Sequence, residues 1–232
     1  MEKNVDSPKD SADQQIVQSS PQSMDDFQLW YLQAKVPQIR HIAFLTALLF
    51  MLYALLEQRM PLNDGVLRLL IHGLLLPAIL LIIGIFSFYP SLHKTMRFLL
   101  VIAPVGAAFA NLYLNSSTTL FAYFAPELYL NIIWTFAISG LTLRYASVTA
   151  TTTVLLILLM AYIAGFDSQF ISLHLLWMLS AFSFGFVSAL VLEKAHQAIY
   201  LQQCELIYSA NSDGLTTLWN RHKMAQLFVY EQ

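Results

Sequence analysis

Six apolar segments of roughly 20 residues each constrain this chain more than any other feature of its sequence. They lie at residues 39–56, 66–89, 95–113, 127–143, 145–165 and 171–192. A helix of about 20 residues crosses the hydrocarbon core of a bilayer. Of the 232 residues, 57% are hydrophobic and only 11% are charged, whereas about 25% are charged in soluble domains. The sequence predicts an all-α membrane protein with a six-transmembrane-helix bundle at residues 38–192.

Basic residues predict the orientation of this bundle in the lipid bilayer. The cations at one set of helix ends are Lys35, Arg40, Lys94, Arg97, Arg144 and Lys194, against Arg59 and Arg68 at the other. Cytoplasmic loops carry the excess of Lys and Arg, so both termini are predicted to be cytoplasmic. The fourth and fifth segments are expected to form a tight hairpin around Arg144. The charges are segregated to the ends and loops, so the net charge of -2 says little, but the lack of a basic patch predicts no nucleic-acid partner.

Two segments precede the bundle in the sequence. Residues 1–25 are poor in large apolar side chains, which predicts a disordered cytoplasmic tail. Residues 26–37 combine Phe27, Trp30, Tyr31 and Lys35 and are expected to form a short interfacial amphipathic helix that ends at Pro37.

The sixth apolar segment is predicted to continue as a helix through residues 193–212. No Gly or Pro interrupts the chain between Leu192 and Gly214. A heptad seam on this signalling helix would consist of Leu192, Ala195, Ile199, Gln202, Leu206 and Ser209. The seam predicts a dimerisation linker, and a plain amphipathic helix is an equally good interpretation of fewer than three heptads.

The run after this linker carries a recognisable motif, Asp-x-Leu-Thr-x-Leu-x-Asn-Arg. Its positions are Asp213, Leu215, Thr216, Leu218, Asn220 and Arg221. The motif resembles the opening of the GGDEF domain of diguanylate cyclases. Thr217 stands where the family usually has Gly, and His222 where it usually has a second Arg. Residues 213–232 are therefore expected to be the truncated start of an α/β GGDEF domain.

The resemblance implies a function for the whole protein. A complete GGDEF domain makes cyclic di-GMP from GTP with Mg²⁺, and the chain stops at Gln232, before the residues for that chemistry, so it is expected to be inactive by itself. Residues 38–192 would be a sensor domain in the bacterial inner membrane, relaying a stimulus through the sixth span of a homodimer. Two alternatives are a haem- or metal-binding redox sensor, and an input domain for a degenerate, non-catalytic GGDEF receptor.

Polar side chains gather in the outer half of the predicted bundle. They are Arg68, His72, Asn111, Glu127, Asn131 and His174, with Tyr113, Trp134 and Trp177 as aromatic neighbours. Arg68 and His72 are four residues apart and share a helix face, as do Glu127 and Asn131. This pattern predicts a pocket for an unknown small or lipophilic ligand. The alternative is ordinary polar packing and an aromatic belt near the membrane surface.

Two histidines also allow a cofactor hypothesis. His72 and His174, at equal depth, could be the axial ligands of a b-type haem. Met178, one turn after His174, would suit copper. No other metal site is predicted. The middle of every span lacks ionisable residues, which argues against a pump or an ion-coupled transporter.

Overall fold

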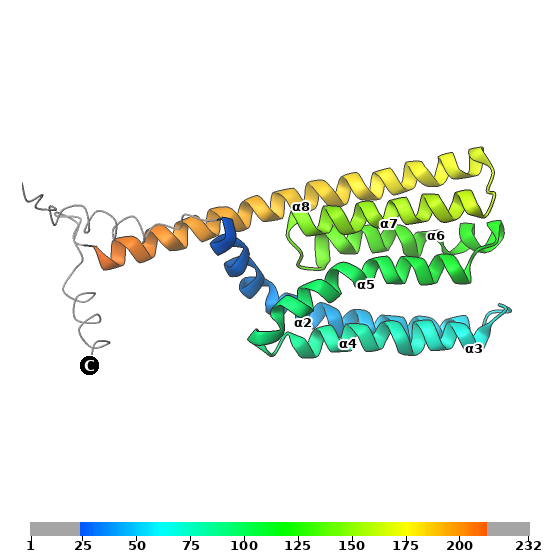
Figure 1. Ribbon diagram of the computed structural model, residues 1–232, viewed down its shortest axis with the longest axis horizontal. Helices are drawn as coiled ribbons and strands as arrows, with labels where there is room; N and C mark the ends of the chain where they lie inside the picture. The colour runs from blue at the N-terminus through cyan, green and yellow to red at the C-terminus, as the bar shows by residue number, and fades with distance from the viewer. Residues whose placement is uncertain (1–23, 213–232) are drawn as a thin grey trace, which may run out of the picture. The chain divides into compact units, whose positions relative to one another are not determined.

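The computed structural model describes residues 24–212 of the chain (Figure 1). These fall into two compact units, each considered by itself: residues 32–193, and a smaller unit in which residues 24–31 pair with residues 194–212. The GGDEF-like motif at residues 213–221 and the tail at residues 1–23 lie outside the described residues.

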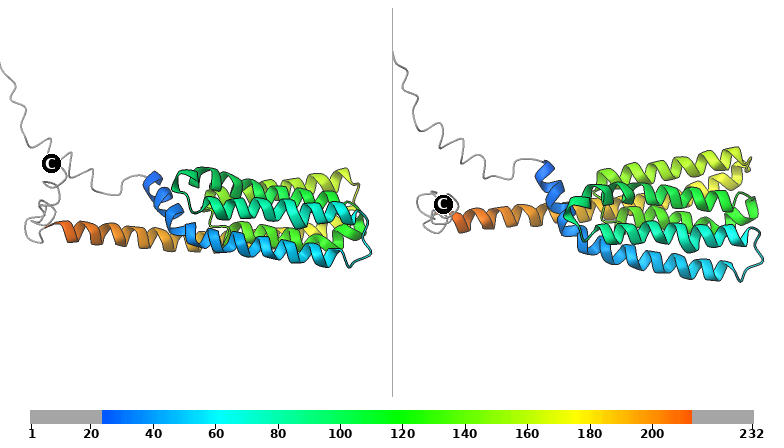
Figure 2. Two further views of the ribbon diagram at one scale, coloured as in Figure 1. Left: turned by 90° about the horizontal axis from the view of Figure 1, so that it is seen from below. Right: turned by 60° about the horizontal axis from the view of Figure 1, so that its bottom comes forward.

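Every assigned element among the described residues is a helix. The α-helices are α2 (Met24–Glu57), α3 (Gly65–Arg68), α4 (Leu76–Phe86), α5 (His93–Leu114), α6 (Thr118–Ile133), α7 (Leu143–Ile163) and α8 (Ser168–Asn211). Two π-helical segments, η1 (Leu69–Leu75) and η3 (Trp134–Ile138), and one 3₁₀ turn, η2 (Pro90–Leu92), complete the set. The helices of residues 32–193 run side by side (Figure 2).

Six of these helical stretches are long and apolar enough to cross a membrane, counted over the described residues. In the most apolar part of each, only 22–44% of the residues are buried. The outward face carries large side chains such as Leu45, Leu155 and Phe184, with exposures of 55%, 61% and 75%. Soluble proteins rarely expose such continuous apolar surface, so the bundle suits a lipid environment. The predicted six-helix membrane protein is confirmed at this level.

Small residues let the central helices pack closely. Ala107 and Ala108 on α5, and Ala146 and Ala150 on α7, are buried in the bundle. Alanines permit close approach of helix backbones, which gains packing contacts where no water is available to drive association. The third and fifth predicted spans agree with α5 and α7 to within two residues.

The first predicted boundary, a helix end at Pro37, is wrong. Pro37 lies inside α2, which runs unbroken from Met24 to Glu57. Proline removes one backbone hydrogen bond, but the remaining backbone groups are still best satisfied within a helix near lipid.

The predicted limits of the fourth span are also wrong. Helix α6 begins at Thr118, where Ser117 caps it by accepting a hydrogen bond from the Leu120 N–H at 3.3 Å, and Pro126 lies inside the helix. The span ends with η3 at Ile138 instead of residue 143.

The turn before α7 is centred on Gly140 and not on Arg144, which lies inside α7. Gly140 has a φ of 79°, and a Cβ atom there would lie 2.7 Å from Ile39 Cγ1. Both the positive φ and the close approach of α2 require glycine at this position.

Helix α8 continues without a break through 44 residues, which is about 66 Å at about 1.5 Å per residue. The expectation that the sixth span extends as a helix beyond Leu192 is therefore confirmed. That this extension lies in the cytoplasm stays a prediction.

Candidate functional site

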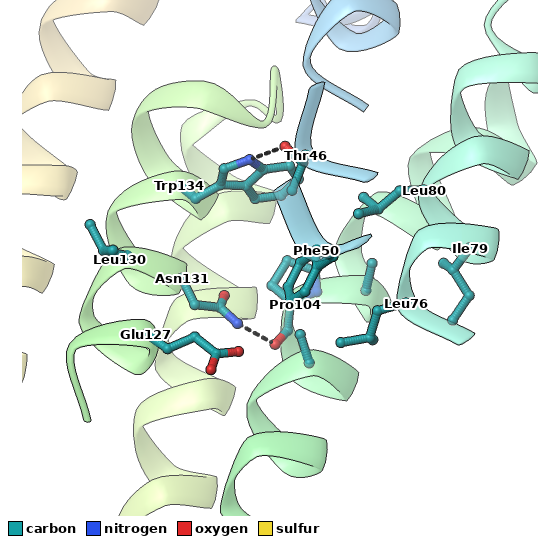
Figure 3. A pocket seen from close by; sticks show the side chains of 12 residues that line it. Thr46, Phe50, Leu76, Ile79, Leu80, Pro104, Glu127, Leu130, Asn131 and Trp134 are labelled. Carbon is teal, nitrogen blue, oxygen red and sulfur yellow. Dashed lines mark hydrogen bonds between the residues drawn. The ribbon is translucent and has the colours of Figure 1, made fainter. Parts of the chain in front are cut away.

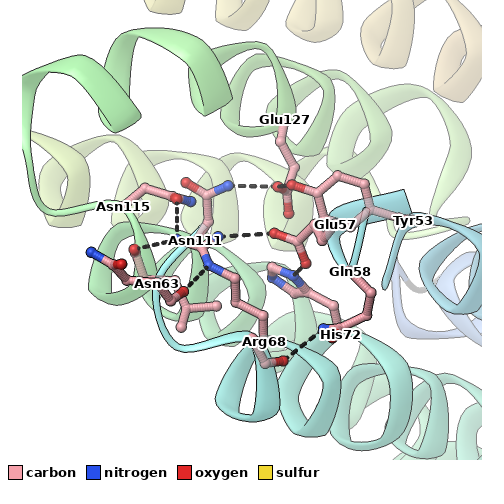
Figure 4. A network of polar contacts seen from close by, with 11 residues as sticks. Tyr53, Glu57, Gln58, Asn63, Arg68, His72, Asn111, Asn115 and Glu127 are labelled. Atoms are coloured by element: carbon pink, nitrogen blue, oxygen red, sulfur yellow. Dashed lines mark hydrogen bonds and ion pairs between the residues drawn. The ribbon is translucent and has the colours of Figure 1, made fainter. Parts of the chain in front are cut away.

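A buried network of charged and polar side chains occupies the bundle end where α2 meets α3 (Figure 4). Its centre is Glu57, the last residue of α2. Glu57 Oε1 accepts a hydrogen bond from Arg68 Nη1 at 2.9 Å, and Glu57 Oε2 lies 2.5 Å from His72 Nδ1. The three residues are 2% exposed or less. The predicted shared face of Arg68 and His72 is confirmed, because both reach one carboxylate.

Arg68 also ties this end of the bundle to α5. Its Nη2 donates to the Leu114 carbonyl at 2.7 Å and to Asn115 Oδ1 at 2.8 Å, and its Nε donates to the Asn63 carbonyl at 3.2 Å. A guanidinium has five donors in a rigid fork. Arg68 thus joins three segments of the chain, and its charge is neutralised inside the protein by Glu57.

A second carboxylate, Glu127 on α6, extends the network. Its Oε2 accepts hydrogen bonds from the Tyr53 hydroxyl at 3.0 Å and from Asn111 Nδ2 at 2.5 Å. Tyr53 also packs against His72, with ring centroids 5.0 Å apart. The network therefore connects α2, η1, α5 and α6.

Glu127 also lies on the wall of a cavity of about 170 Å³ (Figure 3). The cavity is bounded mainly by hydrocarbon, including Phe50, Leu80 and Pro104. Asn131 lies one turn beyond Glu127 on α6 and donates from Nδ2 to the Pro104 carbonyl at 2.8 Å. Ligand-binding pockets typically combine such an apolar lining with a few precisely placed polar groups.

Trp134 forms another wall of this cavity. Its Nε1 donates to Thr46 Oγ1 at 3.2 Å, which fixes the indole between α2 and η3. Trp134 is the first residue of η3, and His72 of the network lies in η1. π-Helical segments occur mostly as single-turn bulges and are frequent at functional sites. Here each of the two segments supplies one residue to the site.

The structure brings together most of the residues predicted for a ligand site. Arg68, His72, Asn111 and Glu127 form the network, and Glu127, Asn131 and Trp134 line the adjoining cavity. That these residues bind a ligand stays a prediction.

His174 and Trp177 have other surroundings. His174 Nδ1 is hydrogen-bonded to the Tyr129 hydroxyl, and its ring packs against Phe121 and Phe170. Trp177 is 54% exposed on the outside of the bundle, as is Tyr113 at 58%. The exposure of both rings is typical of aromatic side chains near a membrane surface.

The neighbours of the two histidines bear on the haem hypothesis. His72 packs against Phe50 and Tyr53, whereas His174 packs against the phenylalanines of α6 and α8. Within residues 24–212, no group of three His, Cys, Asp or Glu side chains is placed to hold a metal ion. Axial ligation by His72 and His174 stays a hypothesis.

Three side chains of the polar network were missed by the sequence analysis: Tyr53, Glu57 and Asn115. Glu57 directly follows the first apolar segment, and only a short connection separates it from Arg68. Two antiparallel helices joined by a short loop have their adjoining ends at the same membrane depth. A cationic side chain within the membrane usually pairs with an acidic side chain or a backbone carbonyl. That combination was the available signal for Glu57. Tyr53 follows from it, being one helical turn earlier.

The smaller unit contains an aromatic cluster. Phe27 and Trp30 of α2 pack against Tyr200 of α8, with ring centroids 5.6 and 5.2 Å apart, and Tyr31 meets His196 edge to face at 5.3 Å. Trp30 Nε1 donates to Gln203 Oε1 at 3.0 Å. These aromatic residues, predicted to anchor at the membrane interface, thus contact the extension of the sixth helix.

The predicted heptad seam lies beside that contact on α8. The α2 segment uses His196, Tyr200 and Gln203, one position after Ala195, Ile199 and Gln202 of the seam. Ile199 and Leu206 of the seam are 44% and 67% exposed. The two stripes are adjacent on the helix surface, since one position corresponds to a rotation of about 100°.

Comparison of the whole chain with protein-family models, curated proteins and solved structures finds no match.

Proposed function

We propose that this chain is the transmembrane sensory input region of a diguanylate cyclase, whose sixth span relays a membrane or periplasmic stimulus to an output domain that starts at Asp213. The observation that carries the proposal is the unbroken helix α8, which leads from the membrane span to Asn211, two residues before the GGDEF-like motif. Cyclic di-GMP synthesis from GTP would be the regulated activity of the protein with a complete output domain.

The length and composition of α8 support a mechanical role. A span needs about 20 residues, and α8 has 44. Sharp kinks in helices arise at Pro, at Gly and Ser pairs or at π-bulges, and the part of α8 from Leu192 to Asn211 has no Gly or Pro. A rotation or shift of the span would therefore be carried to residue 211 without being absorbed by a hinge.

Contacts inside the bundle connect the cavity to α8. Trp134 at the start of η3 faces the cavity, and Phe136 in the same segment packs against Phe182 and Phe186 of α8, with ring centroids 5.0 and 6.1 Å apart. A Cβ atom on Gly185 would lie 2.8 Å from Phe136 Cδ2. A conformational change in η3 would therefore directly alter the packing of the signalling helix.

The exposed seam supports a homodimer. Ile199 and Leu206 are apolar and accessible in one protomer, and heptad positions of this kind bury against a second helix. The polar Gln202 between them weakens the seam, so that two packings of the helix pair could have similar free energies. A stimulus would then need to shift the equilibrium by only a few kcal/mol.

The charge pattern supports cytoplasmic termini in the bacterial inner membrane. Of the two cations at the predicted outer ends, Arg68 is buried against Glu57 and does not act as a loop charge. The bias of basic residues toward the opposite ends supports this orientation.

The test is to change the register of the signalling helix. Residues 1–212 are joined at position 213 to a complete GGDEF catalytic domain, and two or seven residues are inserted after Ile207, beyond the contact with Trp30. Two residues rotate the output by about 200°, whereas seven rotate it by about 20° from the original face. The two-residue insertion should change cyclic di-GMP synthesis by about tenfold, which corresponds to about 1.4 kcal/mol, and the seven-residue insertion by less than about twofold. Equal activity of both variants would refute relay through helix register.

A further inference from the structure

We propose that the cavity beside Glu127 and Asn131 binds a neutral, lipophilic molecule about the size of one aromatic ring that carries a hydroxyl group. The inference rests on the proposed function for the role of the ligand as stimulus, but binding is measurable without an output domain. Four features of the cavity support it: its size, its unpaired acceptor, its charge and its access from lipid.

The size of the cavity limits the ligand to roughly one ring. Its volume is about 170 Å³, and an engineered apolar cavity of about 150 Å³ binds benzene. Phe50 and Trp134 supply aromatic walls, and the indole of Trp134 is held in place by its bond to Thr46. Such walls favour an aromatic guest packed edge to face or offset.

The amide of Asn131 gives the cavity its polarity. The Asn131 Nδ2 group is already engaged with the Pro104 carbonyl, whereas Asn131 Oδ1 is buried without a hydrogen-bond partner among the described residues. A buried acceptor without a partner is unfavourable. A ligand hydroxyl that donates to Asn131 Oδ1 would remove this cost, so the complementary group is a donor.

Glu127 restricts the charge of the ligand. The Glu127 carboxyl group lies on the cavity wall and no cationic side chain among the described residues does, so an anion would lose its hydration there without gaining a partner. Glu127 Oε2 already accepts hydrogen bonds from Tyr53 and Asn111, both neutral donors. A cationic ligand would have to leave its hydration shell for walls made mostly of hydrocarbon, which is costly. A neutral molecule with one hydroxyl fits these conditions best.

Access to the cavity is from the bilayer side. Leu130 lines the cavity and is 65% exposed on the outer surface of the bundle. The cavity wall therefore reaches the lipid-facing surface at this residue. A lipophilic compound concentrated in the bilayer could enter there without crossing the polar network.

The experiment compares two fluorinated probes of the same shape, 4-fluorophenol and 4-fluorotoluene, by ¹⁹F NMR titration of the full chain in lipid nanodiscs. Affinities are expressed relative to the probe concentration in the bilayer. Ala103→Leu fills the cavity, Asn131→Ala removes the acceptor, and Ala122→Leu adds the same side chain at an exposed position of α6 as a matched control.

We expect saturable binding of 4-fluorophenol to the wild type and to Ala122→Leu, about tenfold tighter than 4-fluorotoluene, which corresponds to about 1.4 kcal/mol. Asn131→Ala should bind both probes within about twofold of each other, because the hydroxyl has lost its partner. Ala103→Leu should lose saturable binding of both.

Three results would overturn the proposal. The first is uptake of 4-fluorophenol that rises linearly with concentration and is equal in the wild type and Ala103→Leu. The second is equal affinity of the wild type for 4-fluorophenol and 4-fluorotoluene, and the third is tighter binding of 4-fluorobenzylamine than of 4-fluorophenol. If Ala103→Leu does not fold, the comparison of the wild type with Asn131→Ala still decides. None of these results depends on helix register, so failure here is distinct from failure of the relay.

Discussion

The Arg68 guanidinium donates to the Glu57 carboxylate at 2.9 Å, with the two side chains 2% and 1% exposed. Removing one member of a buried ion pair leaves an uncompensated charge and costs about 3–5 kcal/mol. Glu57→Ala should therefore lower the unfolding free energy by about this amount, measured by denaturant titration of the protein in mixed micelles. Arg59→Ala, an exposed cation in the α2–α3 connection, is the matched control and should change stability by less than about 0.5 kcal/mol. An equally small effect of Glu57→Ala would show that the pair contributes nothing to folding.

Glu127 should be sensitive to loss of its tyrosine donor. Tyr53→Phe removes the 3.0 Å hydrogen bond while keeping the ring that packs on His72, and should cost about 1–2 kcal/mol. Tyr162→Phe makes the same chemical change at a residue that is 81% exposed, and should be neutral within about 0.5 kcal/mol. Unfolding midpoints of the two variants in the same detergent give the comparison. Equal midpoints would contradict a stabilising bond at Glu127.

Gly140 and Gly165 allow backbone strain to be separated from crowding. Both have positive φ, at 79° and 67°, but only at Gly140 would a Cβ meet another atom, Ile39 Cγ1 at 2.7 Å. Gly165→Ala should cost about 1–2 kcal/mol for the left-handed conformation alone, and Gly140→Ala should cost more. The pair Ile39→Ala and Gly140→Ala should be less destabilising together than the sum of the single changes, by about 0.5 kcal/mol or more. Strict additivity would exclude crowding between the two residues.

The contact between Phe136 and Gly185 should matter for signalling. Gly185→Ala places a methyl group 2.8 Å from Phe136 Cδ2 and forces the ring to shift. In the fusion to a complete GGDEF domain, we expect basal cyclic di-GMP synthesis to change by about tenfold, because the packing of α8 on η3 is altered. Gly106→Ala is the matched control, since nothing lies within 4 Å of a Cβ at that position of α5. Unchanged synthesis in Gly185→Ala would argue against coupling through η3.

The aromatic cluster of the smaller unit can be tested by hydrogen exchange. Tyr200→Ala removes the ring that contacts Phe27 and Trp30, so amide exchange in residues 26–31 should accelerate by about tenfold. Tyr208→Ala, at a residue of α8 that is 47% exposed, should leave that exchange unchanged. If lipid headgroups rather than α8 hold residues 26–31, neither substitution will have an effect.

The sequence was sufficient for features that depend on local composition. The apolar runs predicted the spans that became α5 and α7, and spacing by four residues placed Arg68 and His72 on one face. The sequence was insufficient for features that tertiary contacts determine. Pro37 suggested a helix end, yet it lies inside α2, because backbone groups near lipid have few partners outside the helix.

The division of polar residues between network and cavity could not be predicted either. His174 was predicted to share the depth of His72, but its partner Tyr129 and its phenylalanine neighbours follow from the arrangement of α6 and α8. Glu57 was missed because a charged residue after an apolar run is usually a solvated boundary. Its role depends on Arg68, a residue of the next span.

That pairing has a consequence for biogenesis. An unpaired arginine in a membrane helix is costly to insert, by up to about 2.5–3.5 kcal/mol when it lies at the helix centre, and no acidic residue follows Arg68 before Glu127. Glu57 has already been synthesised when Arg68 leaves the ribosome. The first two spans should therefore partition into the bilayer together, as a helical hairpin whose opposite charges are already joined.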